Sequence, residues 1–271
     1  MPKINDLIKN ETKGIEMDTE HLIIEQTLNS LFYKKPKYKR ELKMLKMQYQ
    51  QKQTSGDRVG LHASNIIASE NDFCYRAQLL SLFFKQLQGE NVQIGLKRIF
   101  EAGTSIGEKW QRLFIRGDLG NIDDMDITRF CKKYDMTYTP DAVIKIGKKL
   151  YVVEIKSQNT FQFKKANSHP SGMKQLKFYM WLTGIHNGFV LVEDKNDQNF
   201  KIYLANDYHV SDVEPYIERL EFIKRHKKEF VENKKAPKRK CKSSDVKRAL
   251  NCNMQNVCWN VNNSRIRLDK C

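Results

Sequence analysis

The chain has 271 residues, 40% of them hydrophobic, and carries a formal net charge of +16 at pH 7. This length suffices for one domain of about 200 residues with extensions, or for two small domains. No stretch approaches the roughly 18 apolar residues of a membrane-spanning helix. The N-terminus also lacks the apolar stretch of a secretory signal. We therefore expect a cytoplasmic protein that makes no contact with a membrane.

The positive charge is concentrated in two segments. Residues 34–52 hold eight Lys or Arg and one Glu, and residues 224–248 hold twelve Lys or Arg and three acidic residues. Such segments favour contacts with the phosphates of a nucleic acid, although a merely solvated surface is the alternative. Arg76, Lys164 and Lys165 are further candidates for phosphate contacts, which add affinity without reading sequence.

The periodicity of apolar residues predicts helices in the first half of the chain and a mixture of strands and helices in the second. Helices are expected over 18–33 with Asp18 as N-cap, from Pro36 to about Gln53, over 74–88 and over about 93–115. There follow a β-hairpin over 139–156, a helix over 173–183 that stops at Gly184, strands over 189–192 and 199–204, and a helix from a Ser211–Glu214 capping box to about Lys228.

This order of elements predicts an α/β domain with a mixed sheet flanked by helices. We divide the chain into three parts. Residues 1–55 form an N-terminal helical and basic extension, residues 56–232 the core, and residues 233–271 a basic C-terminal segment that contains cysteines.

The hairpin over 139–156 is the most informative segment. If Gly147-Lys148 is a two-residue turn, Asp141 lies directly opposite Glu154, with Cβ atoms about 4.5–5.5 Å apart. A turn at Lys148-Lys149 would instead make Asp141 a diagonal neighbour of Glu154, still close enough to share a metal ion.

Lys156 follows Glu154 by two residues and therefore points to the same face of the strand. Val152, Val153 and Ile155 make this strand apolar on both faces, as in a buried strand. Charged groups placed there need partners or a metal ion, because burying an unpaired charge is costly. The pattern favours a site for a hard divalent cation that acts on phosphate. An ordinary surface hairpin with a polar face is the alternative.

The helix expected over 173–183 adds two polar groups. Gln175 and Tyr179 are four residues apart and share one helix face. Their amide and hydroxyl groups offer neutral hydrogen bonds to a phosphate or a base. Taken alone, a tyrosine in such a helix is more often part of the core.

Pro140-Asp141, Glu154-Ile155-Lys156 and Gln175-x-x-x-Tyr179 together resemble the motifs of the RecB-like branch of the PD-(D/E)XK nuclease superfamily. The segment 103–111, Gly-Thr-Ser-Ile-Gly-Glu-Lys-Trp-Gln, resembles the first motif of that branch. The match extends over about residues 60–260. The resemblance implies a restriction-endonuclease-like mixed β-sheet flanked by helices.

The resemblance also implies roles for these residues. Asp141 and Glu154 would bind Mg²⁺ or Mn²⁺, with Ile155 between the motif residues as part of the metal site. Lys156 would assist the attacking water, and Gln175 and Tyr179 would complete the catalytic group. Phosphodiester hydrolysis suits such a site, because a cation polarises the phosphoryl group and lowers the pKa of bound water. Carboxylate oxygens are ligands that Mg²⁺ accepts.

One position departs from the family pattern. The first motif commonly has a metal-binding His where this chain has Gly107. Glu108 follows directly and is a candidate ligand, although on a straight helix it is rotated by about 100°. Without a replacement for the His, metal affinity would be weaker or activity absent.

Six cysteines in a reducing compartment do not suggest a disulfide framework. One early cysteine, Cys74, and three late ones, Cys241, Cys252 and Cys258, resemble the layout of the iron–sulfur nucleases of this branch. Those nucleases include CRISPR-associated exonucleases and AddAB-type nuclease domains. The resemblance implies a [4Fe–4S] cluster held by the four thiolates. Zn²⁺ could use the same ligands, and scattered buried cysteines are a third alternative. Cys131 and Cys271 receive no role.

The function favoured by these patterns is a metal-dependent DNA nuclease, an exonuclease acting in recombination, repair or phage DNA metabolism. The expected partners are single- or double-stranded DNA ends and a recombination or helicase protein, in a bacterium or phage. Two alternatives are a catalytically inactive, nuclease-like module that binds DNA ends, and a site-specific endonuclease.

Overall fold

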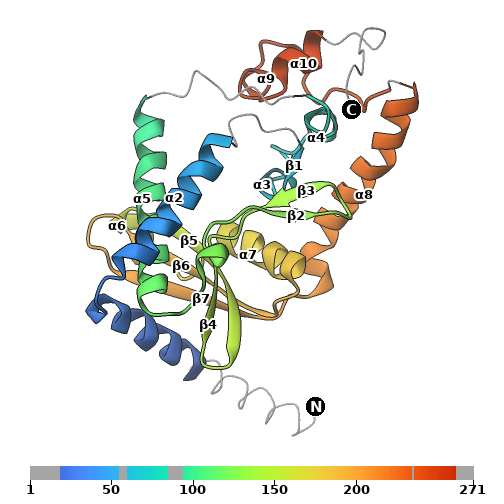
Figure 1. Cartoon of the computed structure of the whole chain (residues 1–271). Coiled ribbons are helices and arrows are strands. Elements are labelled where there is room, and N and C mark those ends of the chain that lie inside the picture. The colour runs from blue at the N-terminus through green and yellow to red at the C-terminus, as the bar shows by residue number, and fades with distance from the viewer. Residues whose placement is uncertain (1–18, 55–59, 85–93, 234, 261–271) are drawn as a thin grey trace, which may run out of the picture.

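A mixed four-stranded sheet lies at the centre of the computed structural model, which describes residues 19–54, 60–84, 94–233 and 235–260. The strands stand in the order β4 (Ala142–Ile146), β5 (Lys149–Gln158), β6 (Asn187–Asp194) and β7 (Phe200–Asn206). The middle pair is parallel and the two outer pairs are antiparallel. With helices on both faces (Figure 1), this sheet confirms the predicted fold class.

The two faces of the sheet are covered by different helices. Val153 belongs to a buried cluster with Trp110 of α5 (Ile94–Arg116), and Val152 to a separate one with Leu176 of α7 (Pro170–Thr183). Strand β5 is therefore buried on both faces, as its continuous apolar pattern predicts. Helix α7 ends at Gly184, whose φ of +70° is the expected left-handed C-cap.

The predicted hairpin turn is confirmed. Ile146 pairs with Lys149, so the turn consists of Gly147 and Lys148, and Gly147 adopts a φ of +60°. Glycine reaches this left-handed conformation without steric cost. The same register, continued one step beyond the pair Ala142 and Val153, places Asp141 opposite Glu154.

The N-terminal helices share the core of the sheet. A helix over residues 19–30 leads through η1 (Leu31–Tyr33) to α2 (Tyr38–Thr54). Their buried apolar residues lie in the same cluster as Trp110; they are Ile24, Leu28, Leu31 and Met44. The expected N-cap Asp18 lies outside the described residues. The boundaries of the predicted extensions stay a prediction.

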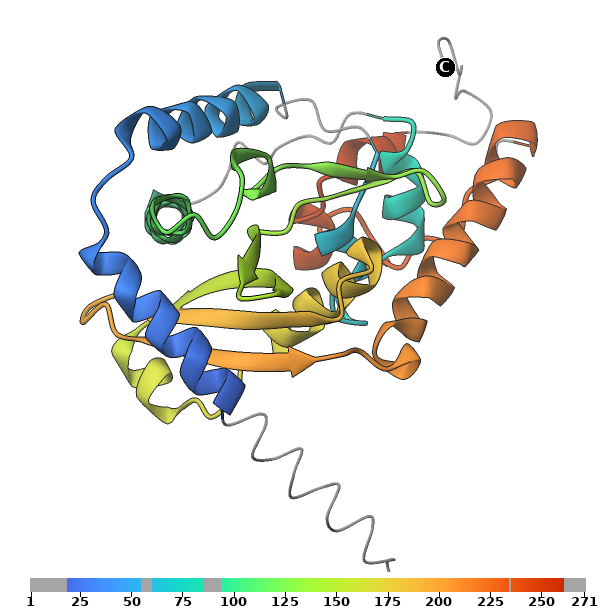
Figure 2. The ribbon, with the colours of Figure 1, turned by 60° about the horizontal axis from the view of Figure 1, so that its bottom comes forward.

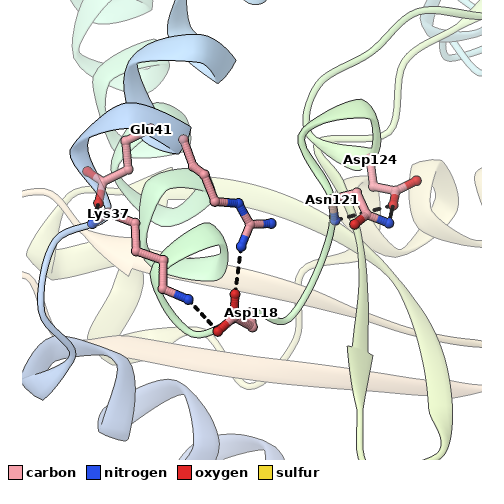
Figure 3. A network of polar contacts seen from close by, with 6 residues as sticks. Lys37, Glu41, Asp118, Asn121 and Asp124 are labelled. Carbon is pink, nitrogen blue, oxygen red and sulfur yellow. Dashed lines mark hydrogen bonds and ion pairs between the residues drawn. The ribbon is translucent and has the colours of Figure 1, made fainter.

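Polar side chains at the start of α2 bond to the end of α5 and to the residues that follow it. Arg116 donates two hydrogen bonds to Glu41, at 2.8 and 3.0 Å. Lys37 and Arg40 both contact the carboxylate of Asp118, just beyond α5, as the network in Figure 3 shows. The same figure shows Asn121 beside Asp124, the capping pair of η3 (Ile122–Asp124).

A second, smaller sheet was not predicted. Its strands stand in the order β1 (Leu61–His62), β3 (Met136–Tyr138) and β2 (Arg129–Cys131). Two or three residues per strand are too few to show a period-two pattern. Next to this sheet lie α3 (Ala63–Ile66) and α4 (Tyr75–Ser81). Helix α4 ends earlier than the predicted helix over 74–88, whose last four residues lie outside the described ranges.

The last elements complete the fold. Helix α8 (Val210–Asn233) begins before the predicted capping box, and the backbone N–H of His209 donates instead to Asp212 at 2.9 Å. The prediction of a Ser211–Glu214 cap is therefore wrong. Short helices α9 (Lys247–Leu250) and α10 (Gln255–Asn260) lie beside α4, and α6 (Thr160–Lys165) follows β5. No helix in the described ranges is long and apolar enough to cross a membrane.

Candidate active site

Asp141, Glu154 and Lys156 come together where β4 and β5 meet. Oδ2 of Asp141 accepts a hydrogen bond from the backbone N–H of Ile155 at 2.6 Å. Nζ of Lys156 lies 2.5 Å from Oε1 of Glu154. The hairpin register therefore gathers two carboxylates and one ammonium group, as the sequence pattern predicts.

The carboxylate of Glu154 is the most deeply buried of the three charged groups. The residue is 1% exposed, and its Oε2 has no hydrogen-bond partner within the described part of the chain. Burial and the neighbouring charge of Asp141 raise the pKa of Glu154 to about 8, against the smaller opposing effect of Lys156. Burial also raises the pKa of Asp141. A bound cation would give this buried oxygen the positively charged partner that it lacks among the described residues.

Lys156 stays cationic despite its burial. Burial alone would lower the pKa of Lys156, but the charges of Glu154 and Asp141 raise it above its ordinary value. Its Nζ donates to Oε1 of Gln175 at 3.2 Å, and Nε2 of Gln175 donates to the hydroxyl of Tyr179 at 3.2 Å. Four of the five residues predicted as catalytic, Glu154, Lys156, Gln175 and Tyr179, thus form one connected network. Asp141 lies beside this network and bonds to the backbone of Ile155.

Tyr179 lies at the end of this network. It is 1% exposed and belongs to the core between α7 and the sheet. Burial, followed by the charges of Glu154 and Asp141, raises the pKa of Tyr179 far above its ordinary value. The hydroxyl therefore remains neutral, and Tyr179 is at once a core residue and a member of the polar network.

A cavity of about 250 Å³ opens between Asp141 and α5. Glu108 lines it together with Asp141 and Ile155, so the structure brings the candidate ligand of α5 to the carboxylate site. Gly107 lines the same cavity, and a Cβ atom added to Gly107 would meet no atom within 4 Å. Position 107 thus has room for a larger side chain next to the cavity.

Asp126 also lines this cavity, and the sequence did not identify it. It lies between η3 and β2 with a φ of +54°, and its backbone N–H donates to the carbonyl of Asp141 at 3.0 Å. Its charge contributes to the raised pKa of Glu154 and of Tyr179. A left-handed backbone costs a non-glycine residue free energy, and such residues are concentrated at functional sites. The only signal in the sequence is the acidic run of Asp123 and Asp124 just before it.

The four cysteines grouped by the sequence lie around one cavity. Cys74, Cys241, Cys252 and Cys258 line one cavity of about 560 Å³. Burial raises the pKa of the Cys252 thiol, and negative charge on the other three thiols adds to the effect. Burial likewise raises the pKa of Cys241, which nearby Arg248 opposes. Cys131 lies in β2, and Cys271 is outside the described residues.

Basic side chains hold the C-terminal segment in place beside α4. Lys240 and Arg248 donate to the carbonyl of Phe73, at 3.1 and 3.0 Å. Arg76 is 5% exposed and donates to the carbonyl of Pro237 at 3.0 Å. The expectation that Arg76 contacts phosphate is therefore wrong, because its guanidinium is buried against this segment.

The acidic side chains of the candidate site do not converge on one position that a metal ion could occupy. Within the described ranges, no group of three or more His, Cys, Asp or Glu side chains is arranged so that it could hold a metal ion. The carboxylates of Asp141 and Glu154 instead bond to Ile155 and Lys156.

Comparison with known proteins gives structural similarity alone. No family model matches the chain, and the search of curated proteins found no match. An alkaline exonuclease from Laribacter hongkongensis, LHK-Exo, is 17% identical with a TM-score of 0.40, over 65% of this chain and 95% of that one. The structure of LHK-Exo in complex with dAMP gives 14% identity and a TM-score of 0.47, over 64% of this chain and 90% of that one. The crystal structure of SSO0001 is 15% identical in sequence with a TM-score of 0.40, over 66% of this chain and 84% of that one.

The raised pKa of Glu154 predicts how stability depends on pH in the presence of a chelator. Between about pH 5 and about pH 8 the folded chain keeps a proton on Glu154 that the unfolded chain, with a pKa near 4.5, releases. Rising pH therefore favours unfolding. Relative to Glu154→Gln, which cannot ionise, the Tm of the unchanged protein should fall by several degrees across this range. Parallel Tm curves for the two proteins would contradict the assignment.

Proposed function

We propose that the protein is a metal-dependent nuclease that hydrolyses DNA phosphodiester bonds, acting as an exonuclease. The observation that carries this proposal is that Asp141 and Lys156 lie close to Glu154, whose buried Oε2 has no hydrogen-bond partner in the part of the chain that the structure describes. The resemblance of these residues to the RecB-like nuclease motifs supports the same conclusion.

The oxygen atoms at this site are of the chemical kind that binds a hard divalent cation. The unpartnered Oε2 of Glu154 and the carboxylate of Asp141 are oxygen donors of the type that Mg²⁺ and Mn²⁺ prefer. Ile155 can contribute only its backbone carbonyl, and Glu108 faces the same cavity in place of the family's histidine. When bound, the cation would polarise a phosphoryl oxygen and lower the pKa of a bound water.

The chain's own groups have distinct parts in the reaction. Lys156, held cationic by the two carboxylates, can orient the attacking water and stabilise negative charge that develops on the phosphate. Its high pKa makes it a poor base, so this charge-stabilising part is favoured over proton abstraction. Gln175 and Tyr179 fix the direction of its ammonium group. Asp126 positions Asp141 through its backbone hydrogen bond.

We further propose that the cysteine cavity holds a [4Fe–4S] cluster. Four thiols from Cys74 and the C-terminal segment match the ligand set of such a cluster. Lys240 and Arg248 lie close enough to stabilise thiolate charge at Cys241. A recombination or helicase protein as a partner stays a prediction.

The proposed reaction leads first to a prediction on catalysis. Asp141→Asn and Glu154→Gln should each lower the rate of DNA degradation with Mg²⁺ or Mn²⁺ by about a thousandfold, because each removes a charge that holds the cation. Degradation is followed on end-labelled single- and double-stranded DNA. Asp135→Asn, which changes an exposed carboxylate paired with Lys227, serves as the control and should retain full activity.

The same assay separates the alternatives. An exonuclease needs an end and leaves closed circular DNA intact, whereas a site-specific endonuclease cuts the circle and gives a fixed fragment pattern. Binding of DNA ends without cleavage by the unchanged protein, with either metal, would establish the inactive module instead. Undiminished cleavage by both carboxylate variants would refute the proposed site.

A second prediction concerns the open space at Gly107. Gly107→His should strengthen Mn²⁺ binding roughly tenfold, because the imidazole enters a cavity that already contains Glu108 and Asp141. Titration calorimetry measures the effect. Gly107→Ala is the matched control, since it removes the glycine without adding a ligand. Equal Mn²⁺ affinities of the two variants would show that position 107 does not face the metal.

A third prediction concerns the cysteines. Protein purified without oxygen should be brown and contain about four iron atoms per chain. Cys241→Ser/Cys252→Ser should lose the colour and have a lower Tm, because a structural metal group contributes folding free energy. Cys131→Ser, outside the cavity, should keep both properties. A colourless protein with one equivalent of zinc would reject the cluster, and an unchanged Tm of the double variant would reject any structural metal there.

A further inference from the structure

The outward face of α2 exposes large side chains that nothing in the described structure covers. Tyr38 is 75% exposed, Leu42 54% and Tyr49 63%. In an α-helix these positions lie within about 40° of one another around the axis, so the three side chains form one stripe. Exposed apolar groups that gather on one face mark interaction surfaces more often than scattered ones do.

Lysines accompany this stripe. Lys39, Lys43 and Lys46 are exposed on the same helix, and none of the three makes an ion pair within the described part of the chain. Two nearby cations differ, because Lys37, just before α2, and Arg40 both form ion pairs with Asp118. Figure 3 shows the contact between Lys37 and Asp118. The acidic residues that face α2 thus leave the outward lysines unneutralised.

The one carboxylate within α2 is also occupied. Glu41 is 5% exposed, points inward and bonds to Arg116. The outward face therefore presents rings, an aliphatic side chain, positive charge and the neutral Gln50, but no carboxylate. We call six of these outward residues the α2 face; they are Tyr38, Lys39, Leu42, Lys43, Lys46 and Tyr49.

The α2 face adjoins the candidate active site. From α2, Nε2 of Gln51 donates to the carbonyl of Asp126 at 3.1 Å, and Gln48 bonds to Gln111 of α5 at 2.9 Å. Both Asp126 and Gln111 line the cavity beside Asp141. In Figure 2, α2 lies along the upper edge of the molecule, next to α5. A polymer bound along α2 would thus approach the cavity at the end of the helix that carries Tyr49.

We propose that the α2 face binds a single-stranded segment of the nucleic acid substrate and directs it toward the cavity. Rings of Tyr38 and Tyr49 stack on unpaired bases, and the lysines contact phosphates. A duplex hides the faces of its bases and would engage the lysines alone, so the exposed rings favour a single strand. The two rings lie about 16 Å apart along the helix axis, far enough for separate bases. This inference rests on the proposed function and specifies its substrate.

The test measures binding of equally long oligothymidine and blunt duplex DNA in the presence of EDTA, so that no cleavage occurs. Tyr38→Ala and Tyr49→Ala should each weaken oligothymidine binding about tenfold and leave duplex binding unchanged. Phe161→Ala is the matched control, because Phe161 is 68% exposed on α6, on the opposite side of the molecule from α2 in Figure 2. It should bind both ligands like the unchanged protein.

The lysines predict a second pattern. Changing Lys39, Lys43 and Lys46 together to Gln should weaken the binding of both DNA forms. The slope of log affinity for oligothymidine against log salt should become shallower by about two, as expected for three lost phosphate contacts. Equal Tm values for all variants would show that these exposed changes leave the fold intact.

Three results would overturn the inference. Unchanged oligothymidine binding by a variant that combines Tyr38→Ala with Tyr49→Ala would show that the rings do not touch the strand. Equal weakening of single-stranded and duplex binding by the Tyr changes would show that no base is stacked. Competition by polyglutamate as effective as competition by oligothymidine would identify the face as a surface for acidic proteins.

Failure of the proposed function would look different. Hydrolysis of a small chromogenic phosphodiester with Mn²⁺ reports on the catalytic residues without needing the α2 face. The Tyr variants should hydrolyse this ester at the unchanged rate. If the unchanged protein does not hydrolyse it, the nuclease proposal fails, whereas Tyr-dependent binding in EDTA would still support the strand-binding face.

Discussion

The candidate site depends on the register of one hairpin. Because Gly147 and Lys148 alone form the turn, Asp141 is set opposite Glu154, and a shift by one residue would send Asp141 to the other face of the sheet. The register also determines which side chains of β5 enter each of the two cores. Packing and chemistry are thus specified by the same pairing, so the apolar residues that hold β5 in place also hold the carboxylates.

Burial gives these charged groups their properties. Glu154 and Lys156 lie on a strand covered by helices on both faces, where a charge is costly unless it is paired. The network from Lys156 through Gln175 to Tyr179 meets part of this requirement and leaves one oxygen of Glu154 without a partner among the described residues. The core accepts a destabilising group at this point, and that is expected where function rather than stability selects the residue.

The sequence predicted the local features well and the distant ones unevenly. The turn, the apolar pattern of β5 and the helix with Gln175 and Tyr179 follow from short-range rules, so they could be read directly. Asp126 could not be found this way, because its importance comes from a left-handed backbone and a contact with Asp141 across the fold. Arg76 was misassigned for a similar reason, since charge alone does not reveal that a guanidinium is buried against Pro237. The four cysteines were grouped through a family resemblance rather than their spacing.

The cysteine cavity has a consequence for how the chain matures. One of its walls is supplied by Cys74 near the start of the core, and the opposite wall by the segment that contains Cys241, Cys252 and Cys258. During synthesis Cys74 leaves the ribosome long before Cys241, Cys252 and Cys258. All strands of the central sheet have been synthesised by the time these three cysteines emerge. The cavity can therefore close only after this later segment has been synthesised, and a chain that lacks it would keep the hairpin but lose the contacts of α4 with α10.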